Sequence, residues 1–244
     1  MVVERNIGII GDGATDRKIF IKLIKSILFN NPLPVNYIEL SRKQIRDSID
    51  RYWREASKNK TYYLPASHAL QLQNDVVNVI NNAFSDFGNE LGIGQQVSHH
   101  DILLLTTDSE RYLSSSKDYF QEWSFSLAKL ITGAIEKFYQ VQIQQGCQHQ
   151  YLPMIISLVT FPSTDILVAA AKGKGDVYNQ EASQLKQFVY GTTDLRTLST
   201  EDLDNKALNF ITPDCINALF EKIPESRPFI QILSLLSVPI PDSS

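Results

Sequence analysis

Acidic side chains follow three short apolar segments of the sequence. They are Asp12 after residues 7–10, Asp108 and Glu110 after residues 101–107, and Asp165 after residues 154–160. Carboxylates that are brought together repel one another unless a divalent cation neutralises them, and such a cation can activate water and stabilise a phosphoryl transition state. Because carboxylate oxygens are hard ligands and the sequence contains no Cys or His cluster, we expect Mg²⁺ or Mn²⁺ at such a site and not zinc or copper.

The apolar segments have the composition of strands that are buried in a parallel sheet. We predict strands at residues 5–11, 35–40, 101–107 and 153–160, which are rich in Val, Ile and Leu. Parallel strands end at one edge of an open α/β sheet, where ligands bind, so Asp12, Asp108 and Asp165 are expected to meet there. The structural alternatives are a turn residue at Asp12 and a partner for a helix dipole at Asp165.

The turn after the first strand contains Gly11, Gly13 and Thr15. Glycine lets the backbone turn sharply without the steric cost of a Cβ atom, and the helix start that follows offers N–H groups to an anion. We therefore predict that Gly11, Gly13 and Thr15 can contact a phosphate or a nucleotide, although the turn lacks the complete fingerprint of a P-loop or a dinucleotide site. A helix N-cap is the alternative role for Thr15.

Apolar residues with helical periodicity separate the strands. We expect helices at residues 15–29, 42–56, 68–87, 119–145 and 166–171, and shorter ones at 180–190, 214–222 and 227–236. Alternating strands and helices predict the α/β class, a Rossmann-like parallel sheet with helices on both faces. We expect residues 1–175 to form this domain, with a helical insertion at about 41–98, and residues 176–244 to form a helical extension.

Composition limits the class of protein. The 244 residues are 43% hydrophobic, enough for a sizeable core, and the net charge of -4 argues against nucleic-acid binding by bulk charge but leaves room for a local basic patch. Cys147 and Cys215 lack metal-ligand spacing. The sequence shows no signal peptide and no apolar stretch that could span a bilayer, so we expect a cytoplasmic protein without membrane contact.

A local basic patch lies between Arg42 and Tyr63, a segment that contains seven Lys or Arg residues and three acidic residues. We predict that Arg46, Arg51 and Arg54 contact phosphates and that Trp53 stacks on a base. Arg111 and Lys18 lie near the acids in sequence and are candidates to balance phosphate charge. A solvated helix face with aromatic residues in the core is the alternative for the basic patch.

Two acidic motifs resemble the Toprim domain of topoisomerases, primases and OLD-type nucleases. The first is Gly11-Asp12-Gly13-Ala14-Thr15-Asp16, between a predicted strand and a predicted helix, and the second is Asp108-Ser109-Glu110, after a later strand. In that family a first-strand glutamate and a later Asp-x-Asp motif form a Mg²⁺ site for phosphodiester chemistry. By resemblance, Asp12 takes the place of the first acid, Asp108 and Glu110 that of the pair, and Asp165 that of an acid after the fourth strand. Asp12 is one methylene shorter than its counterpart, and Glu110 is one longer. The resemblance spans about residues 5–170.

Three hypotheses of function follow. The first is a Mg²⁺-dependent nuclease or related phosphodiester-processing enzyme. The second is a non-catalytic Toprim-like module that binds nucleic acid or a protein partner, because the two acid exchanges change the reach of the carboxylates toward a leaving oxygen. The third is a nucleotide-binding or phosphate-binding α/β protein that uses the turn from Gly11 to Thr15.

Replacing Arg46, Arg51 and Arg54 together by Gln tests the basic patch. If each contacts a phosphate, binding should weaken across sequences, and the slope of log affinity against log salt should flatten by roughly two to three units. An unchanged slope would place the contact elsewhere. The fluorescence of Trp53 should also respond to single strands if its ring stacks on a base.

Overall fold

The computed structural model describes residues 5–29, 34–40, 66–92, 94–108, 117–160, 163–177 and 180–235. The chain divides into two compact units. The sheet unit comprises Asn6–Asp12 and Tyr37–Phe161, and the helical unit comprises Met1–Arg5, Gly13–Asn36 and Pro162–Ser244. The predicted helix at 42–56, with Arg46, Arg51, Trp53 and Arg54, lies outside the described residues, as do Glu110 and Arg111.

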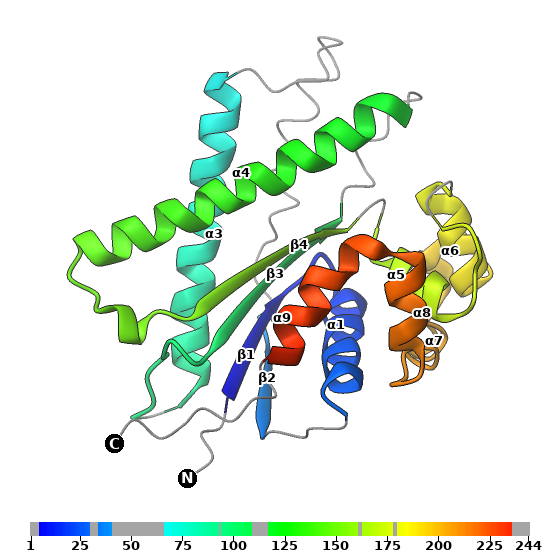
Figure 1. Ribbon diagram of the computed structural model, residues 1–244, viewed down its shortest axis with the longest axis horizontal. Coiled ribbons are helices and arrows are strands. Elements are labelled where there is room, and N and C mark those ends of the chain that lie inside the picture. Colours follow the sequence, from blue (N-terminus) through cyan, green and yellow to red (C-terminus); the bar gives the residue numbers. More distant parts are fainter. Residues whose placement is uncertain are drawn as a thin grey trace. The chain divides into compact units, whose positions relative to one another are not determined.

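Four strands form a parallel sheet in the order β2-β1-β3-β4 (Figure 1). They are β1 (Arg5–Ile10), β2 (Val35–Glu39), β3 (Ile102–Asp108) and β4 (Met154–Thr160). β1 pairs parallel with β3, and β3 pairs parallel with β4. These bounds agree with the four predicted strands to within a residue at each end, and the predicted α/β class is confirmed.

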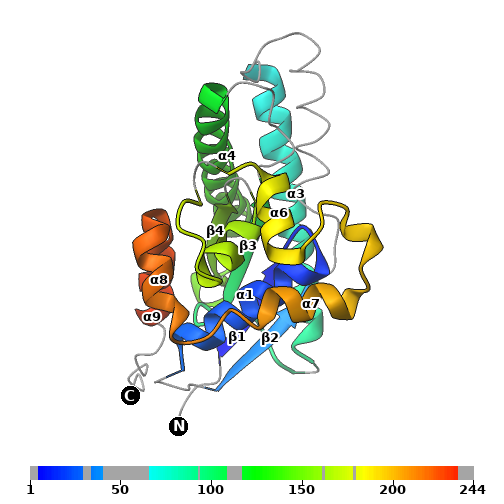
Figure 2. The ribbon, with the colours of Figure 1, turned by 90° about the vertical axis from the view of Figure 1, so that its right-hand side faces the viewer.

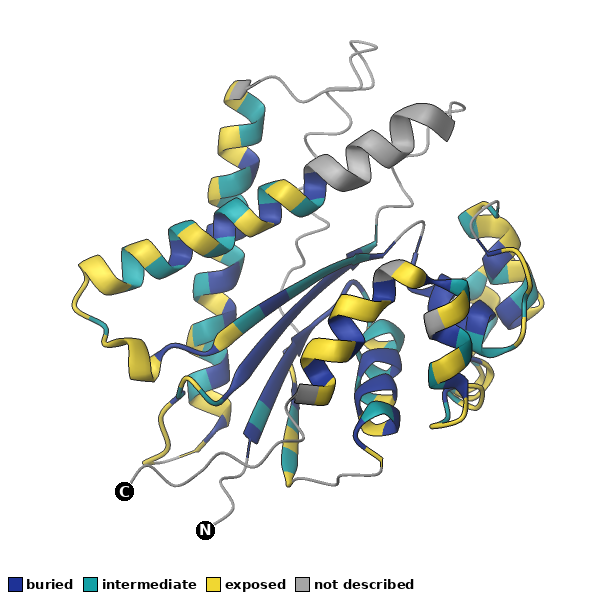
Figure 3. Cartoon of the chain, viewed as in Figure 1, coloured by how far each residue is buried: buried dark blue, intermediate teal, exposed yellow. Residues whose placement is uncertain are grey.

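Burial explains why these strands were recognisable in the sequence. Ile9 of β1 and Leu104 of β3 are at most 1% exposed, and both strands are buried along most of their length (Figure 3). A strand that is covered on both faces reads as a continuous apolar run, without the alternation of a half-exposed strand.

Two long helices supply the main core of the sheet unit. α3 (Ala66–Glu90) and α4 (Lys117–Gln144) pack against each other, side by side in Figure 2. Fully buried side chains of both helices, among them Phe87 and Phe138, join Leu103 and Leu105 of β3 in one cluster. Gly8 of β1 faces this cluster, and a Cβ atom there would lie 3.1 Å from Leu40 and from Phe87. Close packing therefore accounts for a glycine inside the strand.

Two buried carboxylates bind the neighbouring strands β1 and β3, one near each end of the pair. At the amino end, the Asp101 carboxylate is 2% exposed and accepts hydrogen bonds from the Asn6 backbone N–H at 3.0 Å and side-chain amide at 2.9 Å. The Ser98 backbone N–H donates to the same carboxylate at 2.8 Å. At the carboxyl end, Asp12 accepts from β3. Each carboxylate thus joins residues that are distant in the sequence.

The helical unit contains six α-helices in its described part. They are α1 (Ala14–Ile27), α5 (Asp165–Ala171), α6 (Ala182–Tyr190), α7 (Thr200–Leu208), α8 (Cys215–Lys222) and α9 (Arg227–Leu235). α1 packs against α7 and α9, and the Phe20 ring of α1 meets the Phe229 ring of α9 edge to face, with centroids 6.3 Å apart. α5 packs against α6 and α8.

Helix α7 is absent from the predicted elements. Ala207 is its one residue classed as buried, so the segment lacks the apolar periodicity on which the prediction relied. Its start does carry a signal, because the Ser199 hydroxyl oxygen accepts from the Asp202 backbone N–H at 3.1 Å and acids occupy the first turn.

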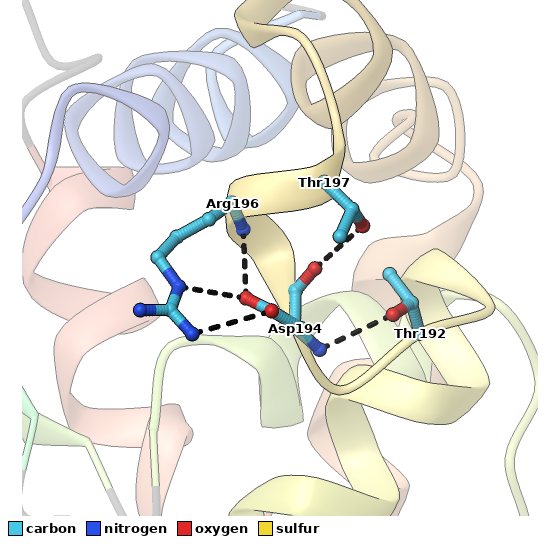
Figure 4. Close-up of polar contacts among 4 residues, drawn as sticks. All are labelled: Thr192, Asp194, Arg196 and Thr197. Atoms are coloured by element: carbon cyan, nitrogen blue, oxygen red, sulfur yellow. Dashed lines mark hydrogen bonds and ion pairs between the residues drawn. The ribbon is translucent and has the colours of Figure 1, made fainter.

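Asp194 organises the turn that precedes α7 (Figure 4). Its carboxylate accepts hydrogen bonds from the Arg196 guanidinium at 2.9 and 3.2 Å and from the Arg196 backbone N–H at 3.3 Å. The Asp194 backbone N–H donates to the Thr192 hydroxyl at 3.2 Å, and the Thr197 hydroxyl donates to the Asp194 carbonyl at 2.7 Å. The Arg196 side chain, and then its backbone N–H, hold the pKa of Asp194 below its usual value.

We predict that Arg196→Gln raises the pKa of Asp194 toward the ordinary 3.8, because the largest cause of the shift is lost. A carboxylate with a lowered folded-state pKa stabilises the fold above its unfolded pKa, and this contribution disappears as the pH falls through the folded value. An NMR titration of the Asp194 carboxyl carbon measures the shift. Lys129→Gln, which removes a charge from an exposed site on α4, is the control and should leave that pKa unchanged.

Tyr139 of α4 is hydrogen-bonded to the start of β4. Its hydroxyl donates to the Pro153 carbonyl at 2.8 Å and accepts from the Ile155 backbone N–H at 2.9 Å. Burial raises the pKa of the Tyr139 phenol, and the bond from Ile155 opposes that rise. One side chain thus satisfies two backbone groups at the point where the chain enters the sheet.

We expect Tyr139→Phe to lower the free energy of unfolding by about 1–3 kcal/mol, since the Pro153 carbonyl and the Ile155 N–H both lose a partner. Urea denaturation followed by circular dichroism measures the change. Tyr151→Phe is the matched control, because Tyr151 is 40% exposed and an exposed hydroxyl should change stability by no more than about 0.5 kcal/mol. Equal effects of the two substitutions would contradict the assigned role of Tyr139.

Candidate functional site

The Asp12 carboxylate lies next to the carboxyl end of β3. It is 5% exposed, and its Oδ2 atom accepts hydrogen bonds from the Asp108 backbone N–H at 2.6 Å and from the Thr107 hydroxyl at 3.1 Å. The parallel register pairs Ile10 with Leu105, so residues just beyond each strand must be neighbours. The structure therefore places the Asp12 carboxylate beside the backbone of Asp108, and the convergence of the two carboxylates stays a prediction.

Asp108 is held from its other side by β4. The register places Asp108 opposite Thr160, and the Thr160 hydroxyl donates to Asp108 Oδ1 at 2.6 Å. Thr160 is 4% exposed, whereas Asp108 is partly exposed. Hydrogen bonds to Asp12 and Asp108 thus link the carboxyl ends of β1, β3 and β4.

The hydrogen bond from the Asp108 backbone limits how far apart the two carboxylates can lie. Bond lengths limit the distance between the Asp108 backbone nitrogen and its own carboxylate oxygens to roughly 5 Å. Because that nitrogen lies 2.6 Å from Asp12 Oδ2, an oxygen of each carboxylate lies within roughly 8 Å of the other. This limit allows one cation to contact both carboxylates through water, and the sharing of an ion stays a prediction.

The ligand chemistry of this pair fits Mg²⁺ or Mn²⁺. Both residues supply hard carboxylate oxygens, and the partial exposure of Asp108 gives an ion access. Within the described residues, no three His, Cys, Asp or Glu side chains form a metal-binding group. Glu110, the third predicted ligand, lies outside that part of the chain. The complete acidic triad therefore stays a prediction.

Asp165 lies in the helical unit, in the first turn of α5. Its carboxylate is 5% exposed and accepts hydrogen bonds from the Tyr190 hydroxyl at 2.9 Å and from the Ser163 hydroxyl at 3.2 Å. An acid in the first turn of a helix also complements the helix dipole, as the structural alternative requires. A metal-binding role for Asp165 stays a prediction.

The start of α1 differs from the prediction. Gly13 is the N-cap, so the alternative of Thr15 as N-cap is wrong. Gly13 also has φ -144° and ψ 169°, an extended conformation that any residue can adopt, so glycine is not needed there for conformational freedom. A Cβ atom there would lie 3.1 Å from the Asp16 carboxylate, so a larger residue would require a small shift of the Asp16 side chain. Gly11 is buried, and its contact with a phosphate stays a prediction.

Asp204 of α7 contacts two residues that were predicted near a phosphate. The Thr15 hydroxyl donates to Asp204 Oδ1 at 3.1 Å, and the Lys18 ammonium donates to Asp204 Oδ2. A phosphate at this position would have to replace these contacts and would be repelled by the carboxylate. The side chains of Thr15 and Lys18 are therefore already paired with an anionic group.

Sequence reasoning missed the hydrogen-bond partners of the acids. They are Thr107, Thr160, Ser163 and Tyr190. It also missed Asp204 as the partner of Thr15 and Lys18. The threonines had a usable signal, since each ends a predicted strand beside an acid or opposite one. Tyr190 and Asp204 had none, because their positions depend on how the helices of the helical unit pack.

A cavity of 460 Å³ occupies the opposite edge of the sheet unit. Its lining includes Phe84 at the end of α3, Gln95 and Val97 before β3, and Cys147 and Tyr151 before β4. These residues lie at the amino ends of the strands, whereas Asp12 and Asp108 lie at the carboxyl ends. The cavity is therefore distinct from the acidic site.

No family model, curated protein or solved structure matches this chain. The similarity to Toprim domains accordingly stays a hypothesis that rests on the two acidic motifs. Among the described helices, none has both the length and the apolar character needed to cross a bilayer.

Proposed function

We propose that this chain is a Toprim-like enzyme that uses Mg²⁺ or Mn²⁺ to cleave phosphodiester bonds in nucleic acid. The observation that carries the proposal is the pairing of Asp12 and Asp108 at adjacent ends of parallel strands, with the Asp108 N–H 2.6 Å from the Asp12 carboxylate. A divalent cation at this position would find carboxylate oxygens, the kind of ligand that it prefers.

The three acidic residues would have different roles in the proposed site. Asp108, partly exposed and fixed by Thr160, would bind the cation directly, and Asp12 and Glu110 would complete the ligand set. When bound, the cation would polarise a phosphoryl oxygen and activate a water molecule. Asp12 also orients Asp108 by accepting its backbone N–H, so the acid at the end of β1 sets the backbone of the acid at the end of β3.

The proposed substrate is nucleic acid because of the basic patch between Arg42 and Tyr63. A chain with a net charge of -4 attracts a polyanion through a local patch and not through its overall charge. Arg46, Arg51 and Arg54 would hold the phosphate backbone and Trp53 would stack on a base, with Arg111 close to the acids in sequence. These residues enter the proposal from the sequence alone.

A second candidate is a non-catalytic module that binds nucleic acid or a protein partner. The burial of Asp12 favours it, because the carboxylate is 5% exposed and already accepts from Asp108 and Thr107. Asp101 provides a comparison, since a similarly buried carboxylate joins β1 and β3 at their other end. The nucleotide-binding hypothesis has less support, since Asp204 pairs with Thr15 and Lys18.

Asp108→Asn tests the catalytic proposal, because the substitution keeps the shape of the side chain and removes its charge. We expect the parent chain to cleave DNA or RNA slowly with Mg²⁺ or Mn²⁺ and not after chelation, and Asp108→Asn to lower the rate by roughly 100-fold or more. Cleavage of labelled single-stranded and double-stranded DNA and RNA measures the rate.

Glu136→Gln is the matched control, since it neutralises an exposed acid on α4 within the same unit. Circular dichroism establishes that each variant is folded. An Asp108→Asn variant with full activity would refute the role of Asp108, whereas a parent chain that cleaves none of the substrates with either metal would favour the binding module.

A further inference from the structure

We propose that Thr160 is a positioning residue for metal binding, whose hydroxyl fixes the orientation of the Asp108 carboxylate. The inference rests on the proposed function, since it concerns the same acidic site. Its basis is the 2.6 Å hydrogen bond from Thr160 Oγ1 to Asp108 Oδ1, made by a side chain that is 4% exposed.

The backbone gives this bond its geometry. Asp108 and Thr160 are direct partners in the parallel ladder of β3 and β4, so their backbone positions are set by the sheet and not by a loop. Threonine is stiff about χ1 because its Cβ atom is branched. A hydroxyl on such a side chain can hold a neighbouring carboxylate in one orientation, and both oxygens of Asp108 then keep a fixed direction.

Among the hydrogen bonds described, the Thr160 hydroxyl has two acceptors. Asp108 Oδ1 lies at 2.6 Å, and the Thr107 carbonyl oxygen lies at 3.2 Å. A hydrogen bond to an ionised carboxylate is shorter and stronger than one to a neutral carbonyl, so the distances assign the proton to Asp108.

Thr106 shows what a purely structural threonine does at the same edge of the sheet. It is 2% exposed and donates to the Ile10 backbone carbonyl at 2.8 Å, without contact to either carboxylate in the hydrogen bonds described. Thr106 and Thr160 are thus two buried hydroxyls that differ in their acceptors. Valine has nearly the same shape as threonine and favours strands at least as well, so valine substitutions at both positions remove one buried hydroxyl each.

Partners that orient metal ligands typically change metal affinity by 10-fold to 100-fold when they are removed. We therefore expect Thr160→Val to weaken the binding of Mn²⁺ by roughly that factor. Thr106→Val should change it by less than about 3-fold, although both variants lose a buried hydrogen bond. Thr160→Ser retains the hydroxyl and should restore most of the affinity lost in Thr160→Val.

Isothermal titration calorimetry of the full chain with Mn²⁺ alone measures these affinities without an activity assay. Thermal melting by circular dichroism establishes that each variant is folded, and Thr160→Ala replaces Thr160→Val if the valine variant is not. The proposal is supported if the parent, Thr106→Val and Thr160→Ser all bind Mn²⁺ more tightly than Thr160→Val does. Equal affinities of parent and Thr160→Val, or equal losses in Thr106→Val and Thr160→Val, would overturn it.

The same titration separates this inference from the proposed function. A parent chain that binds Mn²⁺ while Thr160→Val binds it equally well would reject the role of Thr160 and leave the metal site standing. A parent chain that gives no binding heat up to millimolar Mn²⁺ would reject the metal site itself, and the inference with it.

Discussion

The parallel pairing of β1 and β3 is the constraint on which the candidate site depends. It places the residues that follow the two strands side by side, so the Asp108 backbone N–H can donate to the Asp12 carboxylate. A slip of one residue would turn every side chain of one strand to the opposite face of the sheet. Packing of Gly8 against Phe87 and Leu103 resists such a slip, because residues with side chains would then face the core at that point.

Burial of the acids is the energetic counterpart of this constraint. A carboxylate removed from water is costly unless hydrogen bonds replace its hydration. Asp101 and Asp12 both meet this requirement by accepting backbone N–H groups from a neighbouring segment of chain. The two acids differ in their donors, since Asp12 accepts from the backbone N–H of another acidic residue, Asp108, and Asp101 accepts from the side-chain amide of Asn6. A buried carboxylate thus joins the two strands at each end of the pair, and only at the carboxyl end is its donor another acidic residue.

The sequence was sufficient for the strands and for the neighbourhood of Asp12 and Asp108, because buried parallel strands have continuous apolar sequences and a shared direction. It was insufficient for α7, whose polar composition hides its periodicity, and for the conformation of Gly13, which is set by the turn as a whole. The hydroxyl donor Tyr190 could not be assigned either, since hydrogen bonds between helices depend on how the helices pack.

The two ends of the β1–β3 pair also bear on how the chain folds. Asn6 and Asp101 are 95 residues apart in the sequence. Contacts of such long range lower the folding rate, because the chain must lose the entropy of a long loop before the pairing stabilises it. During synthesis β1 can therefore pair with β3 only after α3 and β3 have left the ribosome. The carboxylates that could bind a cation come together only after this closure, so a metal ion would stabilise the finished sheet and would not guide its early assembly.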